Sequence, residues 1–349
     1  MLKNITARVQ GLNEIAMAAA KARQDTLTKP PGSLGRLEEL SVQLAGISGK
    51  EIPSIKDKVI ITMAGDHGVV EEGVSAFPQE VTPQMVLNFL HGGAAINVLA
   101  RHVGARITIV DMGVAADMES HPSLVNKKVA HGTANMTKGP AMTREQAEQA
   151  ILAGVEVVEA EIEKGLDIVG TGDMGIGNTT PSAAIAAALT GIEPAKIAGR
   201  GTGVDDEGLK RKIDAIERAL KVNKPDPKDG LDVLAKVGGF EIAGLVGVIL
   251  GAAANRKPVM VDGFISTAAA MIAVAIAPAV KPYLISAHRS QEYGHAQMVE
   301  WLSLKPLVDL DFRLGEGTGA ALGISFAEAA CKVLAEMATF AEAGVSDKE

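Results

Sequence analysis

The segment LDIVGTGDMGIGNTTPSAAIAAAL, residues 166–189, changes character twice along its length. It opens with a short apolar run, passes through a glycine-rich stretch and continues as an alanine-rich run behind Pro181. The pattern predicts a buried strand, a tight turn and a helix, because glycine tolerates strained turns and proline suits the first helical position. A strand that leads directly into a helix is the repeating unit of α/β proteins.

Similar strands and helices alternate through the middle of the chain. Short β-branched runs that end in Gly or Asp indicate buried parallel strands, and the intervals carry apolar residues at helical spacing. We therefore expect a doubly wound α/β fold, with a mainly parallel sheet, helices on both faces and ligands beyond the carboxyl ends of the strands. The other expected strands are 59–66, 105–113, 258–263 and 282–288. The expected helices are 83–102, 143–164, 181–189, 205–222, 240–255 and 264–280.

The two ends of the chain lack this alternation. They show helical spacing with no strands between the helices, so we expect a smaller helical part there. Its expected helices are 4–23, 34–47 and 318–341. The sequence thus predicts an α/β domain over 51–317 and a small helical domain formed by 1–50 together with 318–349.

Composition excludes several classes of protein. Of the 349 residues, 47% are hydrophobic and 22% are charged, so neither a disordered chain nor a fibrous repeat fits. Only 3% are aromatic, and 42 acidic residues outnumber 34 basic ones, which disfavours a nucleic-acid partner. The single Cys331 excludes an internal disulfide and fits a reducing compartment. We therefore expect a cytoplasmic protein.

No segment predicts a membrane partner or a secretory leader. The first 23 residues mix charged and apolar side chains in an amphipathic pattern, without an apolar core. The uncharged run at 264–280 is short for a membrane span and contains Pro278. A buried core helix is the better interpretation of that run.

The glycine-rich loop after the strand at 166–173 is the first candidate site. Gly175 and Gly177 allow close approach of a ligand, while Asn178, Thr179 and Thr180 offer side-chain donors at the start of a helix. Free N–H groups and the helix dipole make such a helix start a site for an anion. A tight, well-capped turn explains the same residues equally well, and no standard nucleotide signature matches the loop.

Two further glycine clusters carry charged residues. Gly201 and Gly203 lie between Arg200 and Lys210, which suits a phosphate, although a capped helix with solvated charges is the better interpretation of this cluster by itself. In RLGEGTGAALG (313–323), Glu316 sits between two glycines at the start of a helix. That carboxylate is either an acid favoured by the helix dipole or a general base.

A metal site is the alternative interpretation of the acidic strand ends. Asp66 and His67 end the first strand and could ligate a divalent metal together with Asp111, Asp262 or His288. A metal-dependent phosphoesterase built on Asp66, His67 and Asp262 is the corresponding function. No H-E-x-x-H or comparable pair supports it, so we expect no metal and no other cofactor.

Several segments together resemble one family, the nicotinate mononucleotide:5,6-dimethylbenzimidazole phosphoribosyltransferases. The resemblance covers nearly the whole chain in the family's order, and the phrases GDHGV, MGIGNTT and LGEGTGA are highly specific in combination. The segments are 27–40, 64–101, 170–180, 199–203, 262–270, 288–295 and 314–323.

The resemblance implies an activity. Phosphoribose moves from nicotinate mononucleotide to a nitrogen of 5,6-dimethylbenzimidazole, which gives α-ribazole 5′-phosphate and nicotinate with inversion at the anomeric carbon. It implies Glu316 as general base, the 175–180 loop and the 201–203 turn as the phosphoribose site, and Lys210 as a phosphate partner. Asp173 is a second implied catalytic residue, although the family commonly has the longer Glu there.

The resemblance also implies where the rings bind and how the chain assembles. Phe77, Gln79, Met85 and Leu314 are the implied apolar slot for the benzimidazole, and Ser290 lies in the region implied for the nicotinate carboxylate. The partners are then the two small-molecule substrates, and the chain forms a homodimer. A catalytically idle nucleotide-binding protein is a further alternative, against which Glu316 argues.

Overall fold

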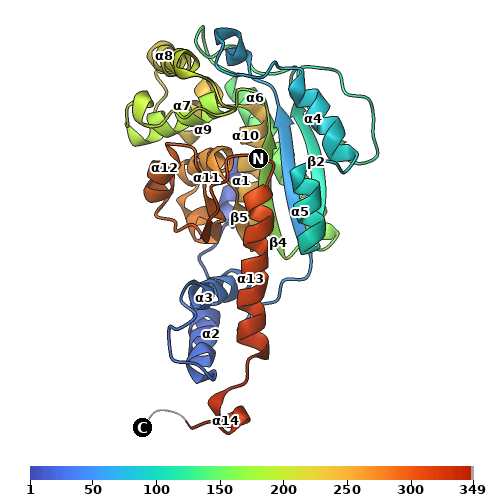
Figure 1. Ribbon diagram of the computed structural model, residues 1–349, viewed down its shortest axis with the longest axis vertical. Coiled ribbons are helices and arrows are strands. Elements are labelled where there is room, and N and C mark those ends of the chain that lie inside the picture. Colours follow the sequence, from blue (N-terminus) through green and yellow to red (C-terminus); the bar gives the residue numbers. More distant parts are fainter. Residues whose placement is uncertain (347–349) are drawn as a thin grey trace.

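The computed structural model describes residues 1–346 and contains one six-stranded, wholly parallel sheet with the order β3-β2-β1-β4-β5-β6 (Figure 1). The doubly wound fold is thereby confirmed. The chain moves outward from β1 in one direction and from β4 in the other, so the order reverses between these two central strands. Ligands of such sheets bind at this switch point, beyond the carboxyl ends. The sheet strands are β1 (Lys58–Gly65), β2 (Arg106–Gly113), β3 (Leu124–Asn126), β4 (Ile168–Met174), β5 (Val259–Val261) and β6 (Leu284–Ser286).

Each predicted strand is present, and one edge strand is additional. The predictions worked because central parallel strands are buried on both faces and form continuous apolar runs. β3 has only three residues and is half exposed, so it carries no such run. A two-stranded pair, β7 (His288–Arg289) with β8 (Val308–Asp309), extends the region after β6.

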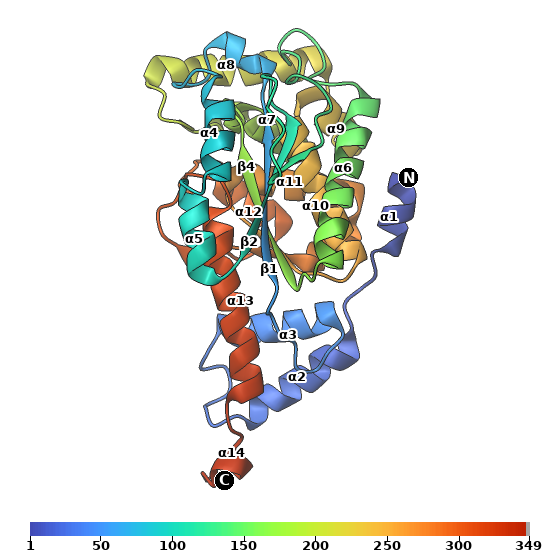
Figure 2. The same cartoon turned by 90° about the vertical axis from the view of Figure 1, so that its right-hand side faces the viewer.

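Alternate residues of β1 point to opposite faces of the sheet and belong to two separate cores. Val59, Ile61 and Met63 pack into a large core with α6, α10 and α11, whereas Ile60 and Ala64 pack with α4, α5 and α13. Figure 2 shows α6 and α10 on one side of the central strands and α4 and α5 on the other. The helices around the sheet are α4 (Val81–Leu90), α5 (Ala95–Val103), α6 (Arg144–Glu163), α7 (Thr179–Thr190), α8 (Asp206–Asn223), α9 (Gly230–Val237), α10 (Phe240–Ala254), α11 (Phe264–Ile276) and α12 (His295–Leu302).

Helices α6 and α10 cross at glycines. A Cβ atom on Gly154 would overlap the carbonyl oxygen of Gly244, and one on Gly247 would overlap that of Ile151. The two backbones therefore touch directly, which no larger residue permits. This contact places α10 close enough to cover the central strands.

We expect Gly247→Ala to lower the free energy of unfolding by about 3 kcal/mol, the upper end of the usual cost of overpacking. The added methyl group would overlap Ile151 O and lie 2.9 Å from Gly154 Cα, so both helices must shift. Denaturant unfolding measures the effect, with Gly139→Ala as control because a Cβ there meets nothing within 4 Å. Equal stability of the two variants would contradict the close crossing.

Two predicted helices are each divided in the structure. The segment 83–102 forms α4 and α5, because Gly92 adopts φ +76° and Asn97 accepts from Ala94 N at 3.1 Å to start a new helix. The segment 4–23 forms α1 (Leu2–Arg8) and α2 (Glu14–Thr26), which Asn13 caps by accepting from Ala16 N. The short helices α9 and α12 were not predicted. Residues 224–229 connect α8 to α9.

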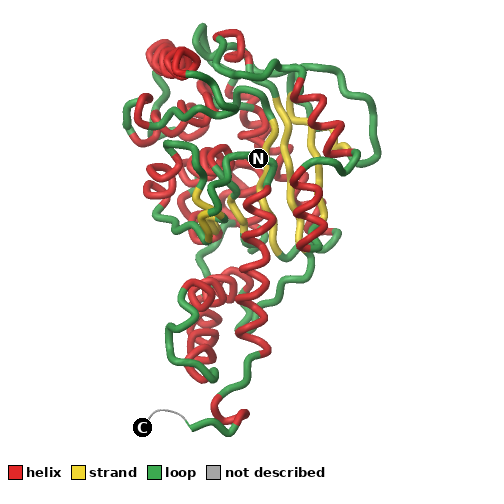
Figure 3. Tube along the Cα trace, viewed as in Figure 1, coloured by secondary structure: helices red, strands yellow, loops and turns green. Residues whose placement is uncertain are grey.

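The helical part consists of α2, α3 (Arg36–Ser48) and the second half of α13 (Thr318–Glu336), with α14 (Phe340–Ala343) beyond it (Figure 3). α1 packs against α10 of the α/β part instead. α13 joins the two parts, since Ala320 and Ile324 lie in the core under the sheet while Leu334 packs with Ala20 and Ala45. The domain boundaries stay a prediction, and residues 347–349 of the expected helical domain lie outside the described residues.

The apolar run at 264–280 forms α11, a helix buried from Phe264 to Ala273, followed by a 3-10 turn, as expected for a core helix. Within residues 1–346, one helix, α13, is long and apolar enough to cross a membrane by length and composition. Over half of its most apolar stretch is buried inside the protein, which is also true of ordinary core helices.

Candidate active site

A cavity of about 240 Å³ opens at the carboxyl end of the sheet, where β4, β5 and β6 end. The cavity thus lies at the ligand-binding edge of a doubly wound sheet, next to the switch point between β1 and β4. The residues predicted from the sequence that line it are Phe77, Asp173, Asn178, Thr179, Gly201, Ser290 and Leu314. Thr202, which also lines it, belongs to the predicted 201–203 turn, and His288 was expected only as a candidate metal ligand. The lining residues that were not assigned a binding role are Gly263, Phe264, Ile265, Glu292, Arg313 and Gly315.

Glu316 follows the cavity-lining residues Leu314 and Gly315 in a turn of unusual backbone geometry. Its φ is +63°, and its neighbours Gly315 and Gly317 have φ +84° and +96°. Few residues other than glycine adopt this conformation, and strain of this kind concentrates at functional sites. The two flanking glycines are therefore required by the turn itself.

The Glu316 carboxylate is almost fully buried. Its Oε2 accepts a hydrogen bond from Ile96 N at 3.2 Å, in the first turn of α5. Burial raises the pKa of Glu316, the negative charge of Asp262 raises it further, and the Ile96 amide opposes both effects. A carboxylate with a raised pKa is suited to accept a proton near neutral pH.

Asp173, at the end of β4, is a second buried carboxyl group. Its Oδ2 accepts from Asn178 Nδ2 at 2.9 Å. Burial raises the pKa of Asp173 well above its usual value, and the charges of Asp262, Glu241 and Glu316 raise it further. The carboxyl group of Asp173 is therefore easier to protonate than that of an ordinary aspartate.

A buried lysine lies beneath the Gly201 turn. Lys212 Nζ donates to Thr179 Oγ1 at 3.0 Å and to Gly199 O at 3.2 Å. Burial lowers the pKa of Lys212 to about 8, and the nearby charge of Glu292 acts in the opposite direction. A Cβ on Gly201 would lie 2.6 Å from Thr179 Oγ1 and 2.8 Å from Lys212 Nζ, so only glycine fits there.

Lys210, the lysine predicted from the sequence, lies outside the cavity. Its side chain is mostly exposed and pairs with Glu207 at 2.8 Å. Lys212, by contrast, lies on the buried face of α8 with Gly208, Ala215, Ile216 and Ala219. The spacing of these residues is helical, and it could have identified Lys212 as the lysine that points inward.

The glycines of the 175–180 loop serve the turn more than a ligand. A Cβ on Gly175 would overlap Gly65 O, and one on Gly177, which has φ +88°, would lie 2.7 Å from Val70 Cγ2. Thr180 is buried, and its hydroxyl has no partner in the described structure. The loop is thus packed against β1, and only Asn178 and Thr179 of it line the cavity.

The remaining predicted residues do not line the cavity. Gly203 lines an outer hollow of about 630 Å³ that shares Gly201, Glu292 and Arg313 with the inner cavity. Gln79 precedes α4 and Met85 lies on it, both half-buried and neither among the lining residues.

His295 fixes the backbone of Ser290. Its Nδ1 accepts from Ser290 N at 3.0 Å, and its Nε2 lies 3.0 Å from Thr267 Oγ1. Because Thr267 donates its only hydroxyl proton to Gly263 O, the imidazole must donate from Nε2 and is neutral. Burial, with the charges of His288 and Arg289, lowers its pKa to about 3.

The residues of the alternative metal site are engaged separately. Asp66 Oδ2 accepts from Ala115 N at 2.8 Å, and His67 Nε2 pairs with Glu241 Oε1 at 2.7 Å. Both oxygens of Asp262 accept backbone N–H groups of the α13 helix start. Within residues 1–346, no three His, Cys, Asp or Glu side chains are arranged to hold a metal ion.

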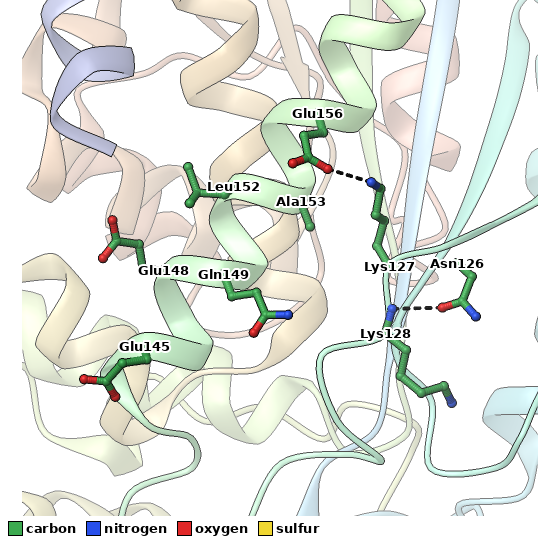
Figure 4. Close-up of a pocket in the computed structure, with 9 residues that line it drawn as sticks. All are labelled: Asn126, Lys127, Lys128, Glu145, Glu148, Gln149, Leu152, Ala153 and Glu156. Carbon is green, nitrogen blue, oxygen red and sulfur yellow. Dashed lines mark hydrogen bonds and ion pairs between the residues drawn. The ribbon is translucent and has the colours of Figure 1, made fainter. Parts of the chain in front are cut away.

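A shallow hollow on the flank of the molecule lies between α6 and the edge strand β3 (Figure 4). It measures about 540 Å³, and Lys127 pairs with Glu156 across it at 2.6 Å. None of the residues predicted for the site lines it. The chemistry suggested by the sequence therefore points to the smaller cavity at the carboxyl edge of the sheet.

The site lies at the edge of a doubly wound sheet and combines a buried lysine, a glycine turn and two carboxyl groups around a cavity. These features define an α/β enzyme suited to a small anionic substrate. A family model described as phosphoribosyltransferase matches residues 9–345. The nicotinate-nucleotide–dimethylbenzimidazole phosphoribosyltransferase of Roseiflexus sp. (strain RS-1) is 63% identical over 100% of this chain and 99% of its own. That of Chloroflexus aggregans is 62% identical over 97% of this chain and 96% of its own.

Solved structures give the same result. The nicotinate-nucleotide–dimethylbenzimidazole phosphoribosyltransferase of Thermus thermophilus has a TM-score of 0.92 at 46% identity, covering 97% of this chain and 100% of its own. A structure described as CobT from that organism has a TM-score of 0.93 at 48% identity, covering 96% and 100%. The chain belongs to the nicotinate-nucleotide–dimethylbenzimidazole phosphoribosyltransferase family and is a pentosyltransferase. The resemblance found in the sequence is confirmed.

Proposed function

We propose that this enzyme transfers phosphoribose from nicotinate mononucleotide to 5,6-dimethylbenzimidazole with inversion at the anomeric carbon, and that Glu316 is the general base. The observation that carries the proposal is the buried Glu316 carboxylate, held by Ile96 N in a strained turn beside the edge cavity. The names of the relatives support the two substrates. The family resemblance also supports a cytoplasmic homodimer as the working form.

The leaving group needs no acid. Nicotinate departs from a pyridinium nitrogen, so breaking the bond neutralises a positive charge. As that bond breaks, positive charge develops on the ribose ring, which a nearby anion stabilises. The second nitrogen of the attacking benzimidazole loses its proton, and Glu316 is the buried carboxylate beside the cavity that is suited to accept it.

The cavity offers an apolar side and a polar side. Phe77 and Leu314 are large apolar residues, half exposed at its mouth, and Phe264 lies further along the lining. A flat aromatic base would bury these faces on binding. We assign the acceptor to this side and Ser290 to the nicotinate carboxylate.

The phosphoribose belongs on the polar side. Thr179 and Gly201 line this side, the Lys212 ammonium donates to Thr179 Oγ1 at 3.0 Å, and Arg313 Nη1 donates to Gly201 O at 3.1 Å. A buried cation next to backbone N–H groups suits a phosphate. Asn178 and Asp173 complete this wall beside the ribose.

We expect Lys212→Met to raise the KM for nicotinate mononucleotide about 10- to 100-fold, because a hydrogen bond from a charged donor contributes about 1.5–3 kcal/mol. The KM for dimethylbenzimidazole should stay unchanged. Lys210→Met removes the exposed lysine of the same helix and serves as the matched control. An unchanged KM for the nucleotide in Lys212→Met would place the phosphate elsewhere.

A turnover assay tests the proposed function. The protein is incubated with nicotinate mononucleotide and dimethylbenzimidazole after exhaustive chelation, and α-ribazole 5′-phosphate and nicotinate are measured by chromatography. We expect both products in equal amounts and no gain on adding magnesium or zinc. No product would contradict the function, and turnover that requires the added metal would favour the phosphoesterase-type interpretation of Asp66, His67 and Asp262.

A further inference from the structure

The backbone turn that carries Glu316 cannot persist by its own preference. Three consecutive residues, Gly315, Glu316 and Gly317, have positive φ, and the middle one has a side chain. Such a conformation survives only where the surrounding structure imposes it. The groups that impose it therefore control where the Glu316 carboxylate lies.

Asp262 provides the strongest of these restraints. It follows β5, is completely buried, and accepts from Gly317 N at 3.2 Å through Oδ2 and from Ala320 N at 2.8 Å through Oδ1. Gly317 is the N-cap residue of α13 and has no side chain to cap the helix itself. The Asp262 carboxylate supplies that cap from another part of the chain and so fixes the last residue of the turn.

Two other groups hold the middle of the turn. Thr62, on β1, donates its hydroxyl proton to Glu316 O at 3.0 Å, and Glu316 N donates to Asp173 O at 3.2 Å. Thr62 is fully buried. Both polar backbone groups of Glu316 are thus bonded to the central strands β1 and β4.

We propose that Asp262, together with Thr62, positions Glu316 for catalysis by holding the 315–317 turn in its left-handed conformation. Neither residue needs to touch a substrate. The inference rests on the proposed function, because it gives these residues a role only if Glu316 is the base.

The charge of Asp262 gives the proposal a distinctive signature. It raises the pKa of Glu316, so removing it should lower that pKa. The other ionisable groups close to this pair are Asp173 on β4 and His288 on β7, whose Nε2 lies 3.8 Å from Asp262 Oδ1. Asp173 also responds to Asp262 and Glu241, and its pKa is raised as well. Because Glu316 is the proposed base, the acid limb of the pH profile should follow the pKa of Glu316.

The test compares Asp262→Asn, Thr62→Val and Glu316→Gln in the turnover assay as a function of pH. We expect Asp262→Asn to lower kcat about 10- to 100-fold with KM values within about threefold, and to shift the acid limb to lower pH. Thr62→Val should lower kcat less and leave the acid limb in place. In the Glu316→Gln background, either substitution should change the remaining turnover by less than about threefold, because it acts only through Glu316.

Asp229→Asn is the control, since Asp229 also accepts from two N–H groups at a helix start but caps α9, away from the cavity. Three results would overturn the inference. They are a wild-type kcat in Asp262→Asn, an acid limb that does not move in this variant, and a large further loss of turnover when Asp262→Asn is added to Glu316→Gln. If Asp262→Asn does not fold, Thr62→Val decides the question. A loss of kcat that disappears in the Glu316→Gln background would support the inference, and a wild-type kcat would overturn it. Full activity of Glu316→Gln itself would contradict the proposed function instead.

Discussion

Replacing Glu316 by Gln is expected to reduce turnover about 10²- to 10⁴-fold, the usual effect of removing a positioned general base. Gln has the same shape, and its amide oxygen can still accept the hydrogen bond from Ile96 N, so the turn should keep its geometry. What is lost is the ability to take the proton from the benzimidazole. Nucleotide binding should change much less, because the donor side of the cavity does not include Glu316.

Single-turnover kinetics and calorimetry with nicotinate mononucleotide separate these two effects. Thermal unfolding is the control for folding. Because burial raises the pKa of Glu316, the charged carboxylate destabilises the fold once the pH exceeds the pKa of an ordinary glutamate. The neutral Gln should therefore be at least as stable as wild type at neutral pH. Turnover above about a third of wild type, with chemistry rate-limiting, would show that the proton leaves by another route.

The same raised pKa predicts the pH dependence of the wild-type enzyme. A base must be deprotonated, so turnover should fall as the pH drops through the pKa of Glu316, and the fall should begin at a higher pH than for an exposed glutamate. Stability has the opposite trend, since a raised carboxyl pKa favours the folded state at low pH and this contribution is lost as the pH rises through it. A profile of kcat against pH measures the first effect.

The sequence was sufficient for the sheet and for the surroundings of Glu316, for reasons visible in the structure. β1, β2 and β4 are largely buried and therefore appear as short β-branched runs that end in Gly or Asp. The glycines beside Glu316 occupy positive φ, a local requirement that the sequence expresses directly. Both signals depend on neighbouring residues alone.

Features that depend on distant contacts could not be predicted. Asp262 looked like a metal ligand because it ends a strand, but its partners Gly317 and Ala320 lie more than fifty residues further along the chain. Lys210 is closer to the glycine turn in the sequence, but Lys212 is the lysine on the buried face of α8. The division of the segment 83–102 was missed for a different reason. Gly92 is a local signal for the end of a helix, but the apolar spacing continues across it.

Replacing Gly201 by Val is expected to lower kcat/KM for nicotinate mononucleotide at least about 10²-fold, the cost of displacing groups at a reacting centre by roughly 1 Å. A Cβ at residue 201 would lie 2.6 Å from Thr179 Oγ1 and 2.8 Å from Lys212 Nζ, closer than atoms can pack. The branched side chain must therefore separate the two donors that we assign to the phosphoribose. The KM for dimethylbenzimidazole should change little, since the apolar side of the cavity around Leu314 is formed by another segment.

Gly203→Val distinguishes steric blockage from backbone strain. Gly203 also has positive φ, at +102°, but a Cβ there meets nothing within 4 Å. Backbone strain of roughly 1–2 kcal/mol is common to both variants and should lower the free energy of unfolding of both. The ratio of kcat/KM between Gly203→Val and Gly201→Val therefore reports the collision with Thr179 and Lys212. A ratio near one would show that the turn tolerates the side chain, and the phosphoribose would then have to bind away from Lys212, for instance in the outer hollow beside Gly203.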